Sequence, residues 1–347
     1  MSVKQASREE FLDVIPGLLR ARYAGMDRVI LDKTVRARRF LDPRNPVFRF
    51  AHIEIFLSCT KDGETDGCAI TIFDRRLSGE GRIGFVEFAD HASGSALLAQ
   101  SVAHLKREGV SVVRAPIDGT IWDRFRLCLD DSNPPFSGEP FNPALYAPVF
   151  LGSGFFPLAE SESMIEPMTD ELRSRYEGNE RTARTSGVEI QLLHSANDPT
   201  LVEDVISLLN TSFADAPSFV SLSRDELVYS ILGSLDTVES DIFVARKGAH
   251  VSGFLLGYID GDNSGRRRYI LKTTAVDPSA RRAGVGGALF SRAIRTASAK
   301  GAEEVIYAIM RKDNAPIRRI AGEEKIRYRT YALYERNVRG DGPATLL

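Results

Sequence analysis

Three hydrophobic runs with strand-like spacing follow one another in the first half of the chain. They are Ile53 to Leu57, then "CAITIF" after the turn cluster "KDGETDG", then "RIGFVEF". Residues 95 to 108 carry apolar side chains at helical spacing, and a further short apolar run follows. Alternation with a period of two predicts strands, whereas a spacing of three to four predicts a helix. The predicted order is therefore strand, turn, strand, strand, helix, strand.

The second half repeats this order. The stretch "DIFVARKGAHVSGFLLGYIDGDNSGRRRYILKTTAV" predicts three strands, and a glycine-rich loop, a helix and a last strand follow. Residues 54–57 match 241–244 at an offset of 187, but after the third strand the offset is 192, as between Gly94 and Gly286. The first copy is thus five residues shorter where the second copy has its loop. This pattern favours a diverged tandem repeat, although two α/β domains that share an element order would look similar.

A chain of 347 residues exceeds what one hydrophobic core usually supports, which predicts two domains. We expect an α/β fold with a mixed sheet in each, over residues 1–166 and 187–347. Residues 167–186, "PMTDELRSRYEGNERTARTS", are polar and charged and are expected to form a linker, in part helical.

Composition limits the classes of partner. The 45 basic and 47 acidic residues nearly cancel, so we expect no nucleic-acid partner and no membrane partner. The three cysteines are odd in number and lack metal-ligand spacing, which favours a reduced cytoplasmic protein and no metal. The N-terminal residues lack the apolar core of a signal peptide, and no run of about eighteen apolar residues occurs.

The loop in "AVDPSARRAGVGGALF", residues 275–290, has the chemistry of an anion site. A strand that ends there and a helix that begins at the glycines leave free backbone N–H groups at a positive helix end. Arginines at 281 and 282 would add charge-assisted hydrogen bonds. The spacing fits neither a dinucleotide fingerprint nor a P-loop. A glycine-rich turn with solvated arginines remains the alternative.

The loop resembles the acyl-CoA pyrophosphate loop of the GCN5-related N-acetyltransferases, the GNAT family, whose pattern is Q/R-x-x-G-x-G/A. Residues 281–286, "RRAGVG", match it, and the strand "EVIYAI" with Asn314 follows in the family's order. The resemblance implies a cofactor-binding set for acetyl-CoA or another acyl-CoA. It consists of Thr274, Ala275, Val276, Arg281, Arg282, Ala283, Gly284, Val285, Gly286, Gly287 and Asn314, with Thr273 at the start of the strand segment that would hold the pantetheine arm.

The first half resembles a second, degenerate GNAT copy. "NPALYAPVFLGSGFF" is similar to the family's last helix and strand, whereas "ADHASGSA" stands where the loop would be. The chain as a whole is therefore identified as a member of the tandem-GNAT proteins. We expect the first copy to be structural or substrate-shaping, without acyl-CoA.

Catalytic residues are less clearly marked. In many family members a Tyr about seven residues after the Asn protonates the leaving thiolate, but that position here is Ala321. Tyr331 is the candidate acid, although strand tyrosines packed for area are the alternative. Asp215, after the first helix of the second half, is the candidate base, and Glu239 and Asp241 compete with it.

The resemblance implies direct transfer of an acyl group, acetyl first of all, from acyl-CoA to a small-molecule amine in a ternary complex. Alternatives are a protein or peptide acyltransferase, a donor on a carrier protein, or a catalytically silent acyl-CoA-binding scaffold. The expected assembly is a monomer or homodimer. The sequence does not name the acceptor or the acyl chain length.

Overall fold

The computed structural model describes residues 1–193, 199–232, 240–261, 265–280, 283–313 and 326–339. It divides the chain into two compact units. The first consists of Met1–Glu160 together with Tyr331–Leu347, and the second of Ser161–Thr330. The expected boundaries, 1–166 and 187–347, therefore differ from the observed division, because the last strand of the chain belongs to the first unit.

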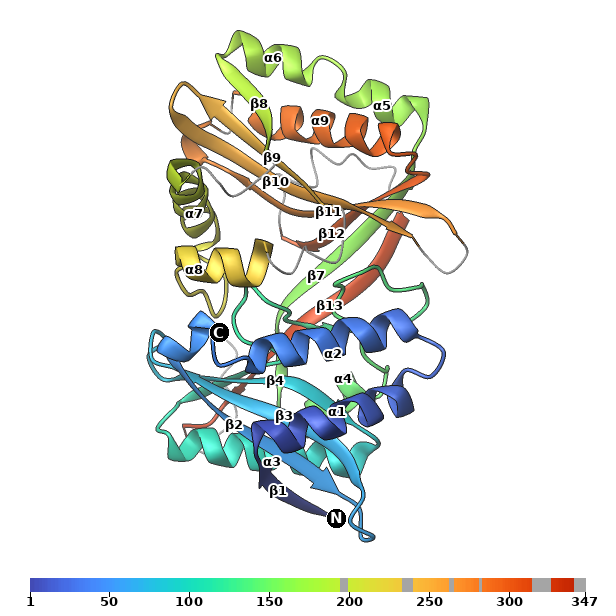
Figure 1. The fold of residues 1–347 in the computed structure, drawn as a ribbon, viewed down its shortest axis with the longest axis vertical. Coiled ribbons are helices and arrows are strands. Elements are labelled where there is room, and N and C mark those ends of the chain that lie inside the picture. Colours follow the sequence, from blue (N-terminus) through green and yellow to red (C-terminus); the bar gives the residue numbers. More distant parts are fainter. Residues whose placement is uncertain (194–198, 233–239, 262–264, 281–282, 314–325, 340–347) are drawn as a thin grey trace. The chain divides into compact units, whose positions relative to one another are not determined.

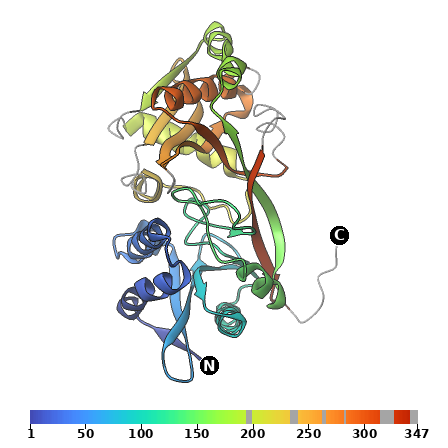
Figure 2. The same ribbon diagram turned by 90° about the vertical axis from the view of Figure 1, so that its right-hand side faces the viewer.

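The first unit contains a sheet with helices on both faces. Its elements are β1 (Ser2–Ala6), α1 (Arg8–Arg22), α2 (Asp27–Leu41), a 3-10 turn at Pro46–Arg49, β2 (Ala51–Cys59), β3 (Thr65–Asp74), β4 (Glu80–Phe88), α3 (His91–Arg107), β5 (Val112–Ala115), β6 (Leu127–Cys128), α4 (Tyr146–Gly152) and the start of β7 (Phe156–Pro167). Strands β1 to β4 pair antiparallel in order, and β5 is parallel to β4. Helices α1 and α2 lie on one side of β2–β4 and α3 on the other (Figure 2).

The apolar face of α3 explains why this helix packs on the sheet. Leu97, Leu98, Val102 and Leu105 are buried and recur at helical spacing, and they join β-strand side chains in one core cluster. The predicted strands and helix of the first half are thus confirmed.

The second unit has the same arrangement. Its elements are the rest of β7, α5 (Asp170–Tyr176), α6 (Asn179–Thr185), β8 (Val188–Leu193), α7 (Pro199–Phe213), α8 (Arg224–Glu226), a π-helical turn at Leu227–Leu232, β9 (Ser240–Lys247), β10 (His250–Gly261), β11 (Arg267–Val276), a 3-10 turn at Pro278–Ala280, α9 (Val285–Ala299), β12 (Glu304–Arg311) and the start of β13 (Ile326–Asn337). Strands β8 to β11 pair antiparallel in order, and β12 is parallel to β11. Helix α9 crosses this sheet, with α5 and α6 beside it (Figure 1).

The repeat seen in the sequence is confirmed in the fold. β4 begins at Glu80 and β11 at Arg267, which reproduces the offset of 187, and β5 begins at Val112 and β12 at Glu304, which reproduces the offset of 192. The five extra residues therefore lie between the third strand and the helix of the second copy.

The last strand of each unit comes from the other half of the chain. The part of β7 from Ser161 to Pro167 pairs antiparallel with β12 in the second unit. The part of β13 from Tyr334 to Asn337 pairs antiparallel with β5 in the first unit. Each sheet is thus completed by an exchanged strand.

The expected linker is part of the second unit. Residues 170–176 and 179–185 form α5 and α6, and Leu172, Tyr176 and Ala183 are buried in the same core cluster as α9. Their polar neighbours face outward, which is why the segment has the composition of a linker.

Candidate functional site

The glycine loop places an uncapped helix N-terminus at the end of β11. Asp277 follows the strand, and its side chain accepts a hydrogen bond from the backbone N–H of Ser279 at 2.7 Å. Gly284 then precedes α9 with φ of 74°, a left-handed conformation that glycine adopts without steric cost, and no side chain caps the helix. The first N–H groups of α9 have no acceptor within the helix and lie at its positive end, so they can bind an anion.

Helix α6 lies against this helix end. A Cβ at Gly287 would lie 2.9 Å from Asn179 Nδ2, and a Cβ at Gly284 would lie 3.4 Å from Thr182 Cγ2. Glu180 on α6 also binds Arg295 on α9 at 2.5 Å. The sequence suggests that Gly287 gives an anion access to the backbone, but the structure explains this glycine by the close approach of α6.

The two parallel strands beside the loop separate before they end. Pairing between β11 and β12 stops at Leu271 and Tyr307, although β11 continues to Val276 and β12 to Arg311. Residues 273–276 stay paired with β10 on their other side. Ala275 is buried, and Thr274 and Val276 are half-buried. This edge of β11 is the segment expected to hold a pantetheine arm, a role that stays a prediction.

Part of the predicted binding set is placed by the structure. Ala283 and the residues from Gly284 to Gly287 come together at the start of α9, next to the end of β11. Arg281, Arg282 and Asn314 lie outside the described residues.

Tyr331 is not brought to this site. It belongs to the first unit, where it is fully buried, and its hydroxyl donates a hydrogen bond to Glu139. Its backbone pairs with Cys128 of β6. Its position in the sequence suggests the second half, whereas the exchanged strand carries it into the first unit. The geometry therefore gives no support to its role as the acid.

Asp215 lies in the turn after α7 and is exposed. It is close enough to Arg311, at the end of β12, to act on it electrostatically. A hydrogen bond to Asp313 raises the pKa of Arg311, and the charge of Asp215 adds to that effect. Asp215 therefore lies near the separated end of β12, as a group that binds or deprotonates an acceptor would.

Asp241, its competitor, is buried and bound to other side chains. It accepts hydrogen bonds from Tyr269 Oη at 2.8 Å and from Lys300 Nζ at 2.8 Å. These contacts make Asp241 a structural ion pair between β9 and the end of α9. Glu239 lies outside the described residues.

The corresponding helix end in the first unit is occupied by its own side chain. Asp90 caps α3 by accepting a hydrogen bond from the N–H of Ser93 at 2.8 Å, and this bond lowers the pKa of Asp90. The Ser93 hydroxyl in turn accepts from the Asp90 N–H. A carboxylate thus already neutralises the helix end that would otherwise attract phosphate.

The strand gap of the first unit is also filled. Pairing between β4 and β5 stops at Arg82 and Arg114, but Asp118 accepts a hydrogen bond from the N–H of Phe85 at 2.6 Å. A Cβ at Gly84 would lie only 2.2 Å from the carbonyl oxygen of Ile117. The chain after β5 therefore occupies the place where a donor arm would enter.

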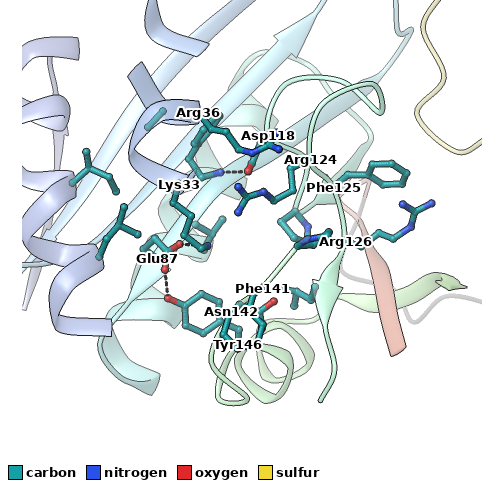
Figure 3. Close-up of a pocket in the computed structure, with 18 residues that line it drawn as sticks. Lys33, Arg36, Glu87, Asp118, Arg124, Phe125, Arg126, Phe141, Asn142 and Tyr146 are labelled. Carbon is teal, nitrogen blue, oxygen red and sulfur yellow. Dashed lines mark hydrogen bonds and ion pairs between the residues drawn. The ribbon is translucent and has the colours of Figure 1, made fainter. Parts of the chain in front are cut away.

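Sequence reasoning missed a cluster of charged side chains in the first unit. Lys33, Glu87 and Tyr146 meet in a cavity lined also by Arg124 and Asp118 (Figure 3). Lys33 Nζ lies 2.6 Å from Glu87, and the Tyr146 hydroxyl donates to Glu87 at 2.7 Å. The residues are far apart in the chain, so no local motif marks them.

Two further features are absent from the part of the chain that the structure describes. No group of three or more His, Cys, Asp or Glu side chains among these residues lies close enough together to hold a metal ion. None of the helices described is long and apolar enough to cross a membrane.

Comparison with known proteins supports the class that the fold and the loop define. Residues 204–321 match the model of the acetyltransferase (GNAT) family. No curated protein matches the chain.

Solved structures match both units. A tandem GNAT protein from the clavulanic acid biosynthesis pathway is 11% identical with a TM-score of 0.60, and the match covers 99% of each chain. GCN5-related N-acetyltransferases from Sphaerobacter thermophilus (13% identity, TM-score 0.53, 98% of this chain and 96% of that one) and Anabaena variabilis (8%, 0.59, 97% and 73%) are also similar. The chain therefore has the tandem GNAT fold, and its second half carries the match to the GNAT family.

Proposed function

We propose that the second unit binds acetyl-CoA or another acyl-CoA and transfers the acyl group directly to the amine of a small molecule. The amine nitrogen attacks the thioester carbonyl, the C–S bond breaks, and the CoA thiolate takes up a proton. Asp215 receives the proton lost by the amine, and backbone N–H groups near Ala275 and Val276 stabilise the oxyanion. No step of this reaction calls on a metal.

The difference between the two helix N-termini is the observation that carries the proposal. In the second unit α9 begins at Gly284 without a side-chain cap, beside a strand edge that β12 leaves unpaired. In the first unit Asp90 caps α3 and Asp118 binds the Phe85 N–H. An anionic donor would be attracted to the first arrangement and repelled by the second.

Calorimetric titration with acetyl-CoA and with a longer acyl-CoA tests the proposal. We expect saturation at one site per chain. Gly284→Glu should abolish binding, because it adds a bulky negative side chain where the pyrophosphate would lie. Gly248→Glu is the matched control, since Gly248 also has a positive φ, at 59°, but lies in the β9–β10 turn.

A stoichiometry of two would contradict the assignment of the first unit as inactive toward acyl-CoA. Unchanged affinity in a folded Gly284→Glu variant would contradict the loop assignment. Where the donor binds, a screen of small amines for thiol release tests turnover, and Asp215→Asn should lower kcat more than it weakens donor binding. Donor binding without turnover on any amine would instead support the silent scaffold.

A further inference from the structure

A charged cavity lies inside the first unit (Figure 3). Helices α1 and α2, strand β4, and residues 116–127 contribute to its walls. Its charged lining consists of the cations Lys33, Arg36, Arg124 and Arg126 and the carboxylates Glu87 and Asp118. The proposed acyl transfer makes no use of these side chains, because its residues belong to the second unit.

The two carboxylates do not balance these cations. Glu87 is neutralised by Lys33, at 2.6 Å, and accepts a further hydrogen bond from Tyr146. Asp118 accepts the Phe85 N–H, and burial raises the pKa of Asp118, which disfavours its charged form. The arginines of the cavity are left with less negative charge than they carry positive charge.

Arg124 shows where the balancing group belongs. Its Nη2 donates to Asp32 at 2.5 Å, but the same carboxylate also binds Arg36 Nε at 2.9 Å. Arg124 is only 8% exposed, and its Nε–H is buried without an acceptor among the described residues. Figure 3 shows its guanidinium pointing toward Lys33 and Glu87 across the cavity. A buried charged donor without an acceptor is costly, and a bound anion would remove that cost.

The rest of the lining is apolar. Ile15, Leu19, Phe125 and Phe141 contribute to the walls. The space inside is about 50 Å³, the room that roughly three or four water molecules take. The cavity therefore suits a small ligand with one anionic end and a short apolar body.

We infer that the first unit is a binding site for a small monocarboxylate, whose carboxylate accepts hydrogen bonds from Arg124 and whose apolar tail lies against Phe125 and Phe141. Because Asp90 and Asp118 occupy the donor side of this unit, the ligand is bound and no acyl group is transferred to it. The site extends the proposed function, since it gives the inactive copy a ligand of its own.

Titration of the full chain with sodium 3-methylbutanoate tests this inference, with 3-methylbutanamide as the uncharged probe of the same shape and sodium chloride as the salt control. Calorimetry and thermal unfolding should show one saturable site for the carboxylate and at least about tenfold weaker binding of the amide, because a hydrogen bond to a charged group is lost. Arg124→Gln should weaken carboxylate binding by a similar factor. Arg107→Gln, at an exposed position of α3, should leave it unchanged.

The comparison of carboxylate with amide uses the unaltered protein, so it decides even if Arg124→Gln does not fold. Equal binding of both probes, or a carboxylate effect no larger than that of sodium chloride, would overturn the inference. Gly284→Glu separates the two proposals: it should abolish acyl-CoA binding and keep carboxylate binding. Loss of carboxylate binding in that variant, while it remains folded, would place the site in the second unit and would also refute the inference.

Discussion

Single residues decide which helix end is available to an anion. Asp90 and Gly284 stand at the same place in the two copies, directly before the helix that follows the third strand. The aspartate satisfies an N–H of its own helix, whereas the glycine has no side chain to do so. One side chain thus accounts for much of the difference between the two units.

Asp90→Ala should lower the free energy of unfolding by about 1 kcal/mol at pH 7, because the cap is lost. The hydrogen bond from the Ser93 N–H lowers the pKa of Asp90 in the folded state, so this stabilisation is present above the unfolded pKa, about 3.9, and is lost as pH falls through the folded pKa. Urea unfolding of both proteins at pH 7 and near pH 3 measures the difference. Asp62→Ala, in the exposed β2–β3 turn, is the control. A difference that does not shrink in acid would mean that the carboxylate is not the cap.

At the scale of elements, the same strand pair has two outcomes. In both units the parallel pair separates after a few residues. In the first unit the chain after β5 turns back, so that Ile117 N donates to Ile83 O at 2.9 Å and Asp118 binds the Phe85 N–H. Gly84 is what permits this close approach of two backbones.

Gly84→Ala should therefore destabilise the protein by about 1–3 kcal/mol, since the added methyl group would lie 2.2 Å from a backbone oxygen that cannot move like a side-chain end. Gly17→Ala is the matched control, because Gly17 lies in α1 with no atom within 4 Å of the added Cβ, and alanine favours helix there. Thermal unfolding should rank the proteins as Gly17→Ala, wild type, Gly84→Ala. A neutral Gly84→Ala would show that the crossing segment is loosely held.

The sequence is sufficient for features that depend on local spacing. The repeated strand order, the helix after the loop and the offset of five residues all follow from periodicity and glycine positions, and the fold confirms them. The Asp90 and Ser93 pair is also a local signal, because both residues of the cap lie within one helical turn. The partner of β13 is different, because alternation shows that a strand exists but not which strand it pairs with. The expected place of Tyr331 is wrong for that reason.

At the scale of the whole chain, the exchange of strands ties the stability of each unit to the other half of the sequence. Ala332 and Tyr334 of β13 are buried in the same core cluster as Leu97 and Phe150 of the first unit. The C-terminal strand therefore completes a core whose other members lie in the first 160 residues. Fragments cut at the expected domain boundaries would each lack one strand of their own sheet.

Ala332→Asp should accordingly unfold the first unit, although the change lies near the C-terminus. Ala332 is fully buried, and a charge without a partner in that core is destabilising by several kcal/mol. Hydrogen exchange followed by mass spectrometry should show faster exchange in β2 to β5 than in the wild type. Arg339→Asp, beyond the end of β13 at an exposed position, is the control and should leave these rates unchanged. Faster exchange confined to β9 to β12 would mean that β13 supports the second unit instead, and would overturn the division of the chain into these two units.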